Sequence, residues 1–380
     1  MPRSIACFLG AGFSYLSGVP LARELFDASA IATSESSWNR FAAVREHYDT
    51  WRKDHPDQHS EQYMGDILNK NAGRNAPKWS WVVEYVCAVI ATTGTPASSK
   101  NRNLRYSNRV TRPYPCEAHR EFWSTIFGLT KDVSVITTNY DIMVERVLRH
   151  RLMQRPPSLG CFYGGLPRPQ RLTGVTEPFS RWSPDRDIEM SGTVPVFKLH
   201  GSLNWTLNGD TIVAYQDMRP VFRHGGTAAI VAPVPEKSAP PWLANVWSGA
   251  AECLRRSDVW VICGYSLPLY DIEVCNLLRD AGRGRCPILY LLSPNSASLR
   301  ARYVDIVPHA KIVCLPGLPI GTAQLAAHCS LARSPRGCLS GVSEQQNPDG
   351  TISESSPSIH YPPSGLPAET RDSSRLKGLR

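Results

Sequence analysis

The 380-residue sequence contains no apolar run of the roughly 18 to 20 residues that a membrane-spanning helix needs. The opening stretch MPRSIACFLGAGFS holds a short apolar run that leads into a glycine turn and not into a small-residue cleavage site, so we expect no signal peptide. The chain also has no internal repeats. These absences predict a cytoplasmic protein that makes no membrane contact.

Paired cysteines are also missing. The chain has 11 cysteines, an odd number, and no two of them form a C-x-x-C pair. Cys7, Cys263 and Cys314 lie in apolar runs, where a thiol behaves as a small hydrophobic group. We therefore expect reduced cysteines and no zinc ribbon.

Short apolar segments rich in β-branched residues dominate the rest of the chain. There are six of them: SIACFLGAG, VSVITTNYD, VPVFKLHGS, VWVICGYSL, PILYLLSPN and KIVCLP. Near-continuous apolar strands separated by helix-forming stretches indicate a parallel sheet that is covered on both faces. Helical spacing follows three of them, in LARELFDASA, DIMVERVLRH and DIEVCNLLRDA. The fold class predicted is α/β, a doubly wound Rossmann-like parallel sheet of about six strands.

Two regions do not fit this alternation. The first two strands are so far apart that residues from about 35 to 125 should form an inserted helical subdomain, with WSWVVEYVCAVIATT as its clearest buried helix. From residue 331 to 380, 21 of 50 residues are Ser, Pro or Gly. We expect a disordered tail there, and a single folded body over residues 1–330.

Polar or glycine-rich motifs follow five of the six predicted strands. The residues concerned are Gly10, Ala11, Gly12 and Ser14; Asn139 and Asp141; His200; Gly264, Tyr265 and Ser266; and Ser293 and Asn295. Each motif alone has an ordinary explanation: Thr138 or Asn139 could cap the next helix, His200 could be structural, and the others could be turns. Together they would meet at the carboxyl edge of one sheet, where such folds bind ligands. The glycine turn would bring backbone N–H groups close to a pyrophosphate, and His200 could act as a general base.

The motifs GAGFSYLSGVP, TTNYD, KLHGSLNW and GYSLPLYD occur in that order. This order resembles the sirtuin (silent information regulator) superfamily, and most closely its divergent bacterial branch of NAD-cleaving anti-phage defence proteins. The resemblance spans roughly residues 4 to 316. It implies that residues 1–330 form a catalytic domain that binds NAD⁺ as its substrate.

The resemblance also implies a role for each matching position. Asn139 would orient the nicotinamide ribose or the attacking water, Asp141 would lie beside the nicotinamide, and His200 would be the base at the ribose hydroxyls. The remaining matches would hold the rest of the dinucleotide: Gly10, Ala11, Gly12 and Ser14 at the pyrophosphate, Gly264, Tyr265 and Ser266 at a phosphate, and Asn295, with Ser293 nearby, at the adenosine ribose.

Departures from the family pattern bear on the reaction. Between residues 203 and 263 the only cysteines are Cys253 and Cys263, so the paired C-x-x-C zinc ligands of protein-deacylating sirtuins are missing. We therefore expect an NAD⁺ glycohydrolase that forms nicotinamide and ADP-ribose and depletes NAD⁺ in anti-phage defence. Two alternatives stay open: an NAD-dependent protein deacylase or ADP-ribosyltransferase, and a nucleotide-sensing module without turnover.

The net charge of +9 suits an anionic ligand. A basic stretch with no acidic residue between Glu145 and Glu177 could contact a nucleic-acid backbone, cover the nucleotide or simply face solvent; it contains Arg146, Arg149, Arg151, Arg155, Arg168 and Arg171. The sequence shows no sensor domain, so activation would come from a partner protein or from self-assembly.

Overall fold

The computed structural model describes residues 2–26, 35–71, 73, 75–93, 117–149, 161–166, 171–172, 188–189, 194–215, 228–234, 238–268 and 270–331. The tail predicted at residues 331–380 lies outside these ranges from residue 332 onward. Three arginines of the basic stretch, Arg151, Arg155 and Arg168, lie outside them as well.

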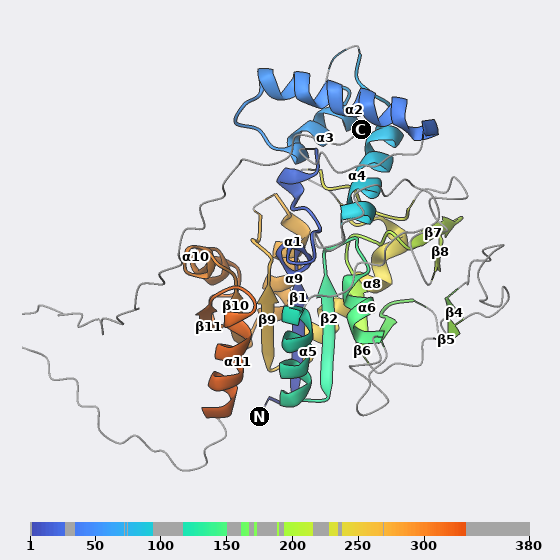
Figure 1. Ribbon diagram of the computed structural model, residues 1–380. Coiled ribbons are helices and arrows are strands. Elements are labelled where there is room, and N and C mark those ends of the chain that lie inside the picture. Colours follow the sequence, from blue (N-terminus) through green and yellow to red (C-terminus); the bar gives the residue numbers. More distant parts are fainter. Residues whose placement is uncertain are drawn as a thin grey trace, which may run out of the picture. The chain divides into compact units, whose positions relative to one another are not determined.

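A seven-stranded, entirely parallel sheet forms the centre of the fold (Figure 1). In sheet order its strands are β11 (Lys311–Leu315), β10 (Ile288–Leu292), β9 (Val259–Cys263), β1 (Ser4–Leu9), β2 (Asp132–Thr137), β6 (Val194–Lys198) and β3 (Cys161–Tyr163). All six residues of β1 are buried. Burial on both faces is the reason that these strands are mostly apolar and show no regular alternation with polar residues.

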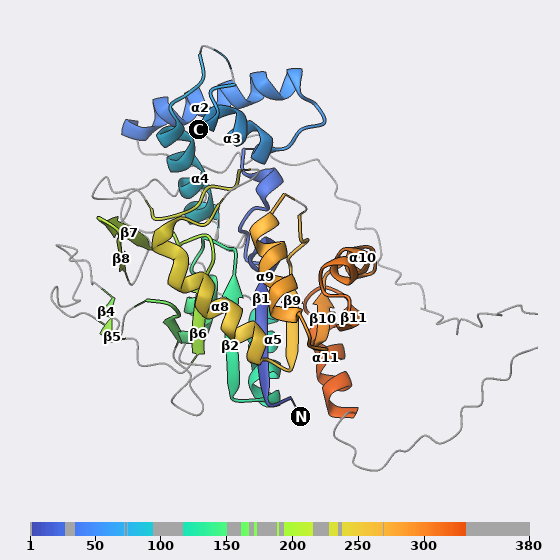
Figure 2. The same cartoon turned by 180° about the vertical axis from the view of Figure 1, so that it is seen from behind.

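Helices cover both faces of the sheet. The helices α5 (Glu117–Leu129) and α11 (Ile320–Leu331) lie on the face turned toward the reader in Figure 1, and α8 (Ala244–Arg256) and α9 (Ile272–Gly282) lie on the opposite face, as Figure 2 shows. The other helices of this layered part are α1 (Ala11–Tyr15), α6 (Met143–Arg149) and α10 (Ser296–Ile306). The doubly wound α/β fold expected from the sequence is thus present.

The expected elements agree with the structure in most places. All six predicted strands occur, and the predicted helices DIMVERVLRH and DIEVCNLLRDA correspond to α6 and α9. The seventh strand, β3, was not expected, because its three residues are embedded in a stretch rich in Pro, Gly and Arg. In the segment LARELFDASA, the described part forms only a 3-10 turn at Ala22–Glu24.

Three further helices, α2 (Glu35–Asp54), α3 (Ser60–Leu68) and α4 (Trp79–Thr93), share an apolar cluster of their own. Stacked aromatic rings such as Phe26 and Tyr85, whose centroids lie 5.2 Å apart, fill it. The same cluster contains Tyr140 and Leu203, which belong to the turns after β2 and β6. The helical segment therefore packs against the carboxyl edge of the sheet. The helix α5 contributes its apolar side chains to the main core instead.

The remaining described elements are a 3-10 helix at Pro241–Leu243 and two short antiparallel strand pairs: β4 (Arg171–Leu172) with β5 (Ile188–Glu189), and β7 (Trp205–Asn208) with β8 (Thr211–Ala214). In the main sheet, β1 lies between β2 and β9. The chain builds one half of the sheet before it crosses β1 to build the other, so the turn after β1 lies at a topological switch point. Ligands of doubly wound folds bind at such a point.

Candidate functional site

The turn after β1 is fastened to the turn after β9. The N–H of Gly10 donates to the carbonyl of Cys263 at 3.0 Å, and the N–H of Gly12 donates to the carbonyl of Gly264 at 2.9 Å. A Cβ atom on Gly10 would lie 2.6 Å from the Gly264 oxygen, which is backbone and cannot move aside. The two glycines are therefore required by contact between protein loops. Their N–H groups are used within the protein, so other groups of the turn would have to hold a pyrophosphate.

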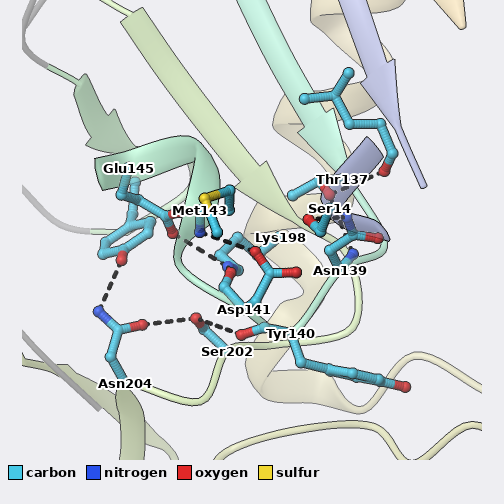
Figure 3. A network of polar contacts seen from close by, with 12 residues as sticks. Ser14, Thr137, Asn139, Tyr140, Asp141, Met143, Glu145, Lys198, Ser202 and Asn204 are labelled. Atoms are coloured by element: carbon cyan, nitrogen blue, oxygen red, sulfur yellow. Dashed lines mark hydrogen bonds and ion pairs between the residues drawn. The ribbon is translucent and has the colours of Figure 1, made fainter. Parts of the chain in front are cut away.

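Asn139 fastens the same turn to β2 from the other side (Figure 3). Its Nδ2 donates to the carbonyl of Gly10 at 2.9 Å and to the hydroxyl of Ser14 at 3.0 Å. Its own N–H donates to Oγ1 of Thr137 at 3.1 Å, and the residue is only 7% exposed. Both amide hydrogens are thus used, and the group that is left to interact with a ligand is the acceptor Oδ1.

Asp141 caps the following helix. Its Oδ1 accepts the N–H of Met143, the first residue of α6, at 2.8 Å. The capping role that the sequence left open for Thr138 or Asn139 therefore belongs to Asp141, which satisfies one of the unpaired N–H groups of the first turn. Asp141 is buried, like Asn139 two residues before it. Its placement beside the nicotinamide stays a prediction.

A buried ion pair stabilises the turn between β2 and α6. Nζ of Lys198, at the end of β6, lies 3.1 Å from Oε1 of Glu145 on α6, and it also donates to the carbonyl of Asp141 (Figure 3). The two charged side chains are only 1% and 2% exposed. Charged groups are almost never buried so deeply unless they are paired. The pair therefore ties the turn that carries Asn139 to the strand that leads to His200.

His200 lies at the end of β6 and is 4% exposed. Its Nε2 is 3.8 Å from Oδ1 of Asp271, the residue that precedes α9. Its ring lies near Tyr140 and Trp247, at centroid distances of 6.3 and 6.4 Å. His200, Asp271 and Trp247 line a common pocket with Val231 and Glu273. A histidine, a carboxylate and aromatic rings thus meet in one place.

The motif after β9 divides into a buried and an exposed part. Tyr265 is 7% exposed, and its hydroxyl donates to Oδ2 of Asp271 at 2.8 Å. Ser266, in contrast, is exposed, and its carbonyl accepts a hydrogen bond from Arg302. After β10, the Ser293 hydroxyl accepts the N–H of the exposed Asn295 at 3.2 Å. Ser266, predicted at a phosphate, and Asn295, predicted at the adenosine ribose, are therefore accessible and lie outside the buried network.

The tyrosines next to this carboxylate remain protonated. Burial, followed by the negative charge of Asp271, raises the pKa of Tyr265 well above its ordinary value. Burial and the same carboxylate do likewise to the pKa of Tyr140. Both phenols are therefore hydrogen-bond donors throughout the physiological range, and neither can serve as a base there.

The buried contacts form a closed circuit. Gly10 joins the turn after β1 to Asn139 and to β9, Tyr140 joins Asn139 to His200, and Asp271 joins His200 back to the motif after β9. Four of the five predicted motifs are thus brought together around the ends of four adjacent strands, β9, β1, β2 and β6.

Sequence reasoning missed several members of this circuit. In the sequence, Asp271 is only the first residue of the predicted helix DIEVCNLLRDA, and no motif marks Lys198 or Glu145. Lys198 could have been found, because it is the one charged residue in the apolar strand VPVFK and so needs a buried partner. No sequence pattern marks His119 on α5. Its Nε2 donates to the carbonyl of Phe13 at 2.5 Å and so fastens α1 to α5.

No helix in the part of the chain that the structure describes is both long and apolar enough to cross a membrane. Within the same ranges, no three histidine, cysteine, aspartate or glutamate side chains are grouped so that they could bind a metal ion.

Comparison with known proteins places the chain only distantly. No family model and no curated protein matches it. Among the solved structures that are similar to it are a point mutant of a Sir2 homologue with ADP-ribose (15% identity, TM-score 0.34, covering 88% of this chain and 95% of that chain), Sir2 with the inhibitor EX-527, 2'-O-acetyl-ADP-ribose and deacetylated p53 peptide (13%, 0.36, 87% and 94%), and Sir2Tm bound to a propionylated peptide (13%, 0.38, 87% and 93%). At these TM-scores the likeness assigns no activity to this chain, whose fold class rests on its own sheet topology.

Proposed function

We propose that this protein is an NAD⁺ glycohydrolase. It would add water across the bond between nicotinamide and ribose, so that NAD⁺ and H₂O yield nicotinamide, ADP-ribose and one proton. The observation that supports this proposal best is the buried circuit that joins Asn139 and His200 at the switch point of the sheet. The order of the sequence motifs adds the dinucleotide as the ligand class.

Cleavage of that bond develops positive charge on the ribose. The reaction needs a group that holds the sugar or the attacking water, and a base that takes a proton from a hydroxyl or from that water. Asn139 offers Oδ1 as a fixed acceptor, because its Nδ2 is held by Gly10 and Ser14. His200 is the one imidazole among the predicted site residues, and it can accept a proton near neutral pH.

Hydrolysis is favoured over deacylation by the state of the cysteines. Cys253 and Cys263, the two that fall between the histidine motif and the motif after β9, are both buried. Neither has a C-x-x-C partner, and structural zinc sites are usually built from such pairs. We propose further that NAD⁺ depletion serves anti-phage defence in the cytoplasm, and that a partner protein or self-assembly triggers it.

The test is incubation of the full-length chain with NAD⁺, with and without candidate triggers, while nicotinamide and ADP-ribose are followed by chromatography. Asn139→Ala and His200→Ala should each lower the rate at least about 100-fold, as expected for the loss of a positioning group or a general base. The exposed Asn276 and His309 provide the matched controls Asn276→Ala and His309→Ala, which should keep wild-type rates.

Rates within a few-fold of wild type for Asn139→Ala or His200→Ala in a folded, active protein would remove that residue from the proposed mechanism. Acylated peptides should leave nicotinamide release unchanged. Release that requires peptide, with O-acyl-ADP-ribose as a product, would identify a deacylase instead. Tight nucleotide binding without release under any trigger would identify a sensor.

A further inference from the structure

Asp271 occupies a helix-capping position without using its side chain as a cap. It is the residue before α9, yet its carboxylate makes no hydrogen bond to the first turn of that helix. The residue is only 2% exposed. Aspartate is favoured at this position because its side chain usually binds the N–H groups of the first turn. A buried carboxylate that is directed elsewhere therefore has another task.

Both carboxylate oxygens of Asp271 face named groups. Oδ2 accepts the hydroxyl of Tyr265 at 2.8 Å, and Oδ1 lies 3.8 Å from Nε2 of His200. The distance to the imidazole is longer than a hydrogen bond, but it is short enough for the carboxylate to stabilise the ring when the ring becomes protonated. Tyr265 is itself held, since its carbonyl accepts the hydroxyl of Tyr303 at 3.1 Å. The carboxylate is thus oriented toward the histidine by a rigid neighbour.

We propose that Asp271, oriented by Tyr265, is the positioning residue that prepares His200 to act as the base; this inference rests on the proposed glycohydrolase function. A carboxylate opposite Nε2 favours the tautomer with its proton on Nε2, so that the neutral ring accepts a proton at Nδ1. When water attacks the ribose carbon and the bond to nicotinamide breaks, the proton of that water goes to Nδ1. The imidazolium that forms is stabilised by the charge of Asp271, and the proton is then released to solvent.

Other titratable groups face His200, and they differ from Asp271 in geometry. From α9, Glu273 lines the same pocket, but its Oε2 accepts the N–H of Ala239 at 3.0 Å. From the turn after β2, Tyr140 lies near the ring as a protonated phenol, and its hydroxyl donates to the carbonyl of Val231 at 2.7 Å. Asp271 differs from both, because one of its carboxylate oxygens lies 3.8 Å from the imidazole Nε2.

The experiment compares wild type with Asp271→Asn and Tyr265→Phe in steady-state NAD⁺ hydrolysis across pH. Asp271→Asn should lower kcat by about 10- to 100-fold, a part of the general-base contribution, and change KM by less than about threefold. The acidic limb of the pH profile should move to lower pH, because the protonated ring loses its stabilising charge. Tyr265→Phe should lower kcat about three- to tenfold, since the carboxylate loses its orienting donor.

The matched control is Asp280→Asn, which removes the same charge from the exposed end of the same helix and should leave kcat and the pH profile unchanged. If Asp271 were purely structural, Asp271→Asn would lower the melting temperature without moving the pH profile of the protein that remains folded. An Asp271→Asn variant with wild-type kcat and an unshifted profile would overturn the proposal. If that variant did not fold, Tyr265→Phe would decide in the same way.

A second readout does not depend on turnover. Nitrogen-15 NMR of histidine-labelled protein reports the tautomer of each imidazole, and His200→Gln assigns the signal of His200. Wild type should show the proton on Nε2, and Asp271→Asn should shift that signal. If NAD⁺ is never cleaved but the NMR shift occurs, the proposed function fails while the contact between Asp271 and His200 stands. If NAD⁺ is cleaved and neither kcat nor the signal responds, the positioning role fails alone.

Discussion

Breaking the buried pair of Lys198 and Glu145 should be one of the most destabilising single changes in the sheet. Lys198→Met keeps most of the side-chain volume but leaves the Glu145 carboxylate, 2% exposed, without its partner. It also removes the hydrogen bond to the carbonyl of Asp141. Removal of one partner of a buried ion pair costs about 3–5 kcal/mol, because the other charge stays desolvated.

This loss can be converted into a temperature. At about 2.1 cal/mol/K per residue, a folded body of about 330 residues has an entropy of unfolding of about 0.7 kcal/mol/K, so a loss of about 3–5 kcal/mol should lower the melting temperature of Lys198→Met by roughly 4–7 °C. The double variant Lys198→Met with Glu145→Leu should recover most of the difference, because replacement of both charges by apolar groups is often close to neutral. Differential scanning fluorimetry and urea unfolding followed by circular dichroism measure both variants.

The control is the pair of Arg255 and Glu252 on α8, whose side chains are 51% and 55% exposed. Arg255→Met should cost less than about 1 kcal/mol, as is usual for a pair screened by water. If Lys198→Met melted within 2 °C of wild type, or if the double variant were no more stable than the single one, the buried pair would not fasten the site as described.

Three further predictions concern the glycine turn after β1, the buried cysteine at the end of β9 and the metal content. Gly10→Ala should lower stability and abolish activity, because its Cβ would lie 2.6 Å from the Gly264 oxygen, whereas Gly128→Ala in α5, where no atom lies within 4 Å, should be neutral or stabilise the helix by up to about 1 kcal/mol; thermal melts compare the two. Burial raises the pKa of Cys263 to about 12, so this thiol should stay protonated and resist iodoacetamide from pH 6 to 9 in the native protein, while the exposed Cys286 is alkylated; mass spectrometry reads both sites, and labelling of native Cys263 would contradict its burial. Metal analysis of the purified chain should find no stoichiometric zinc, and about one zinc per chain would restore the deacylase alternative.

The sheet could be predicted from sequence because each strand carries its own signal. Burial on both faces makes β9 apolar at every position and β1 apolar from Ile5 onward, and the glycine after each marks its end. The strand β3 carries no such signal, since three residues are too few to show a pattern. The segment after Pro20 has helical spacing, yet the described residues form only a 3-10 turn there. Local spacing and helix propensity are weak signals, and tertiary packing overrides them.

The site could be predicted only in part. Asn139 and His200 stood out because each is a polar residue at the end of an apolar strand. The link between His200 and Asp271 cannot be seen in the sequence, because the two residues are distant in the chain and meet only when the start of α9 comes next to the turn after β6. The use of the glycine N–H groups by β9 could not be foreseen either, since a ligand-binding turn and a loop contact have the same sequence pattern.

The strand order explains why one residue can connect both halves of the site. Because β1 is central, Gly10 has β2 on one side and β9 on the other. Its carbonyl accepts the Asn139 side chain from the first half, and its N–H donates to Cys263 in the second. Any movement of this turn would therefore shift Asn139 and the Tyr265–Asp271 pair together. A trigger that acted on the helices α2, α3 and α4, which pack on the turn containing Tyr140, would reach both proposed reacting groups through the same few contacts.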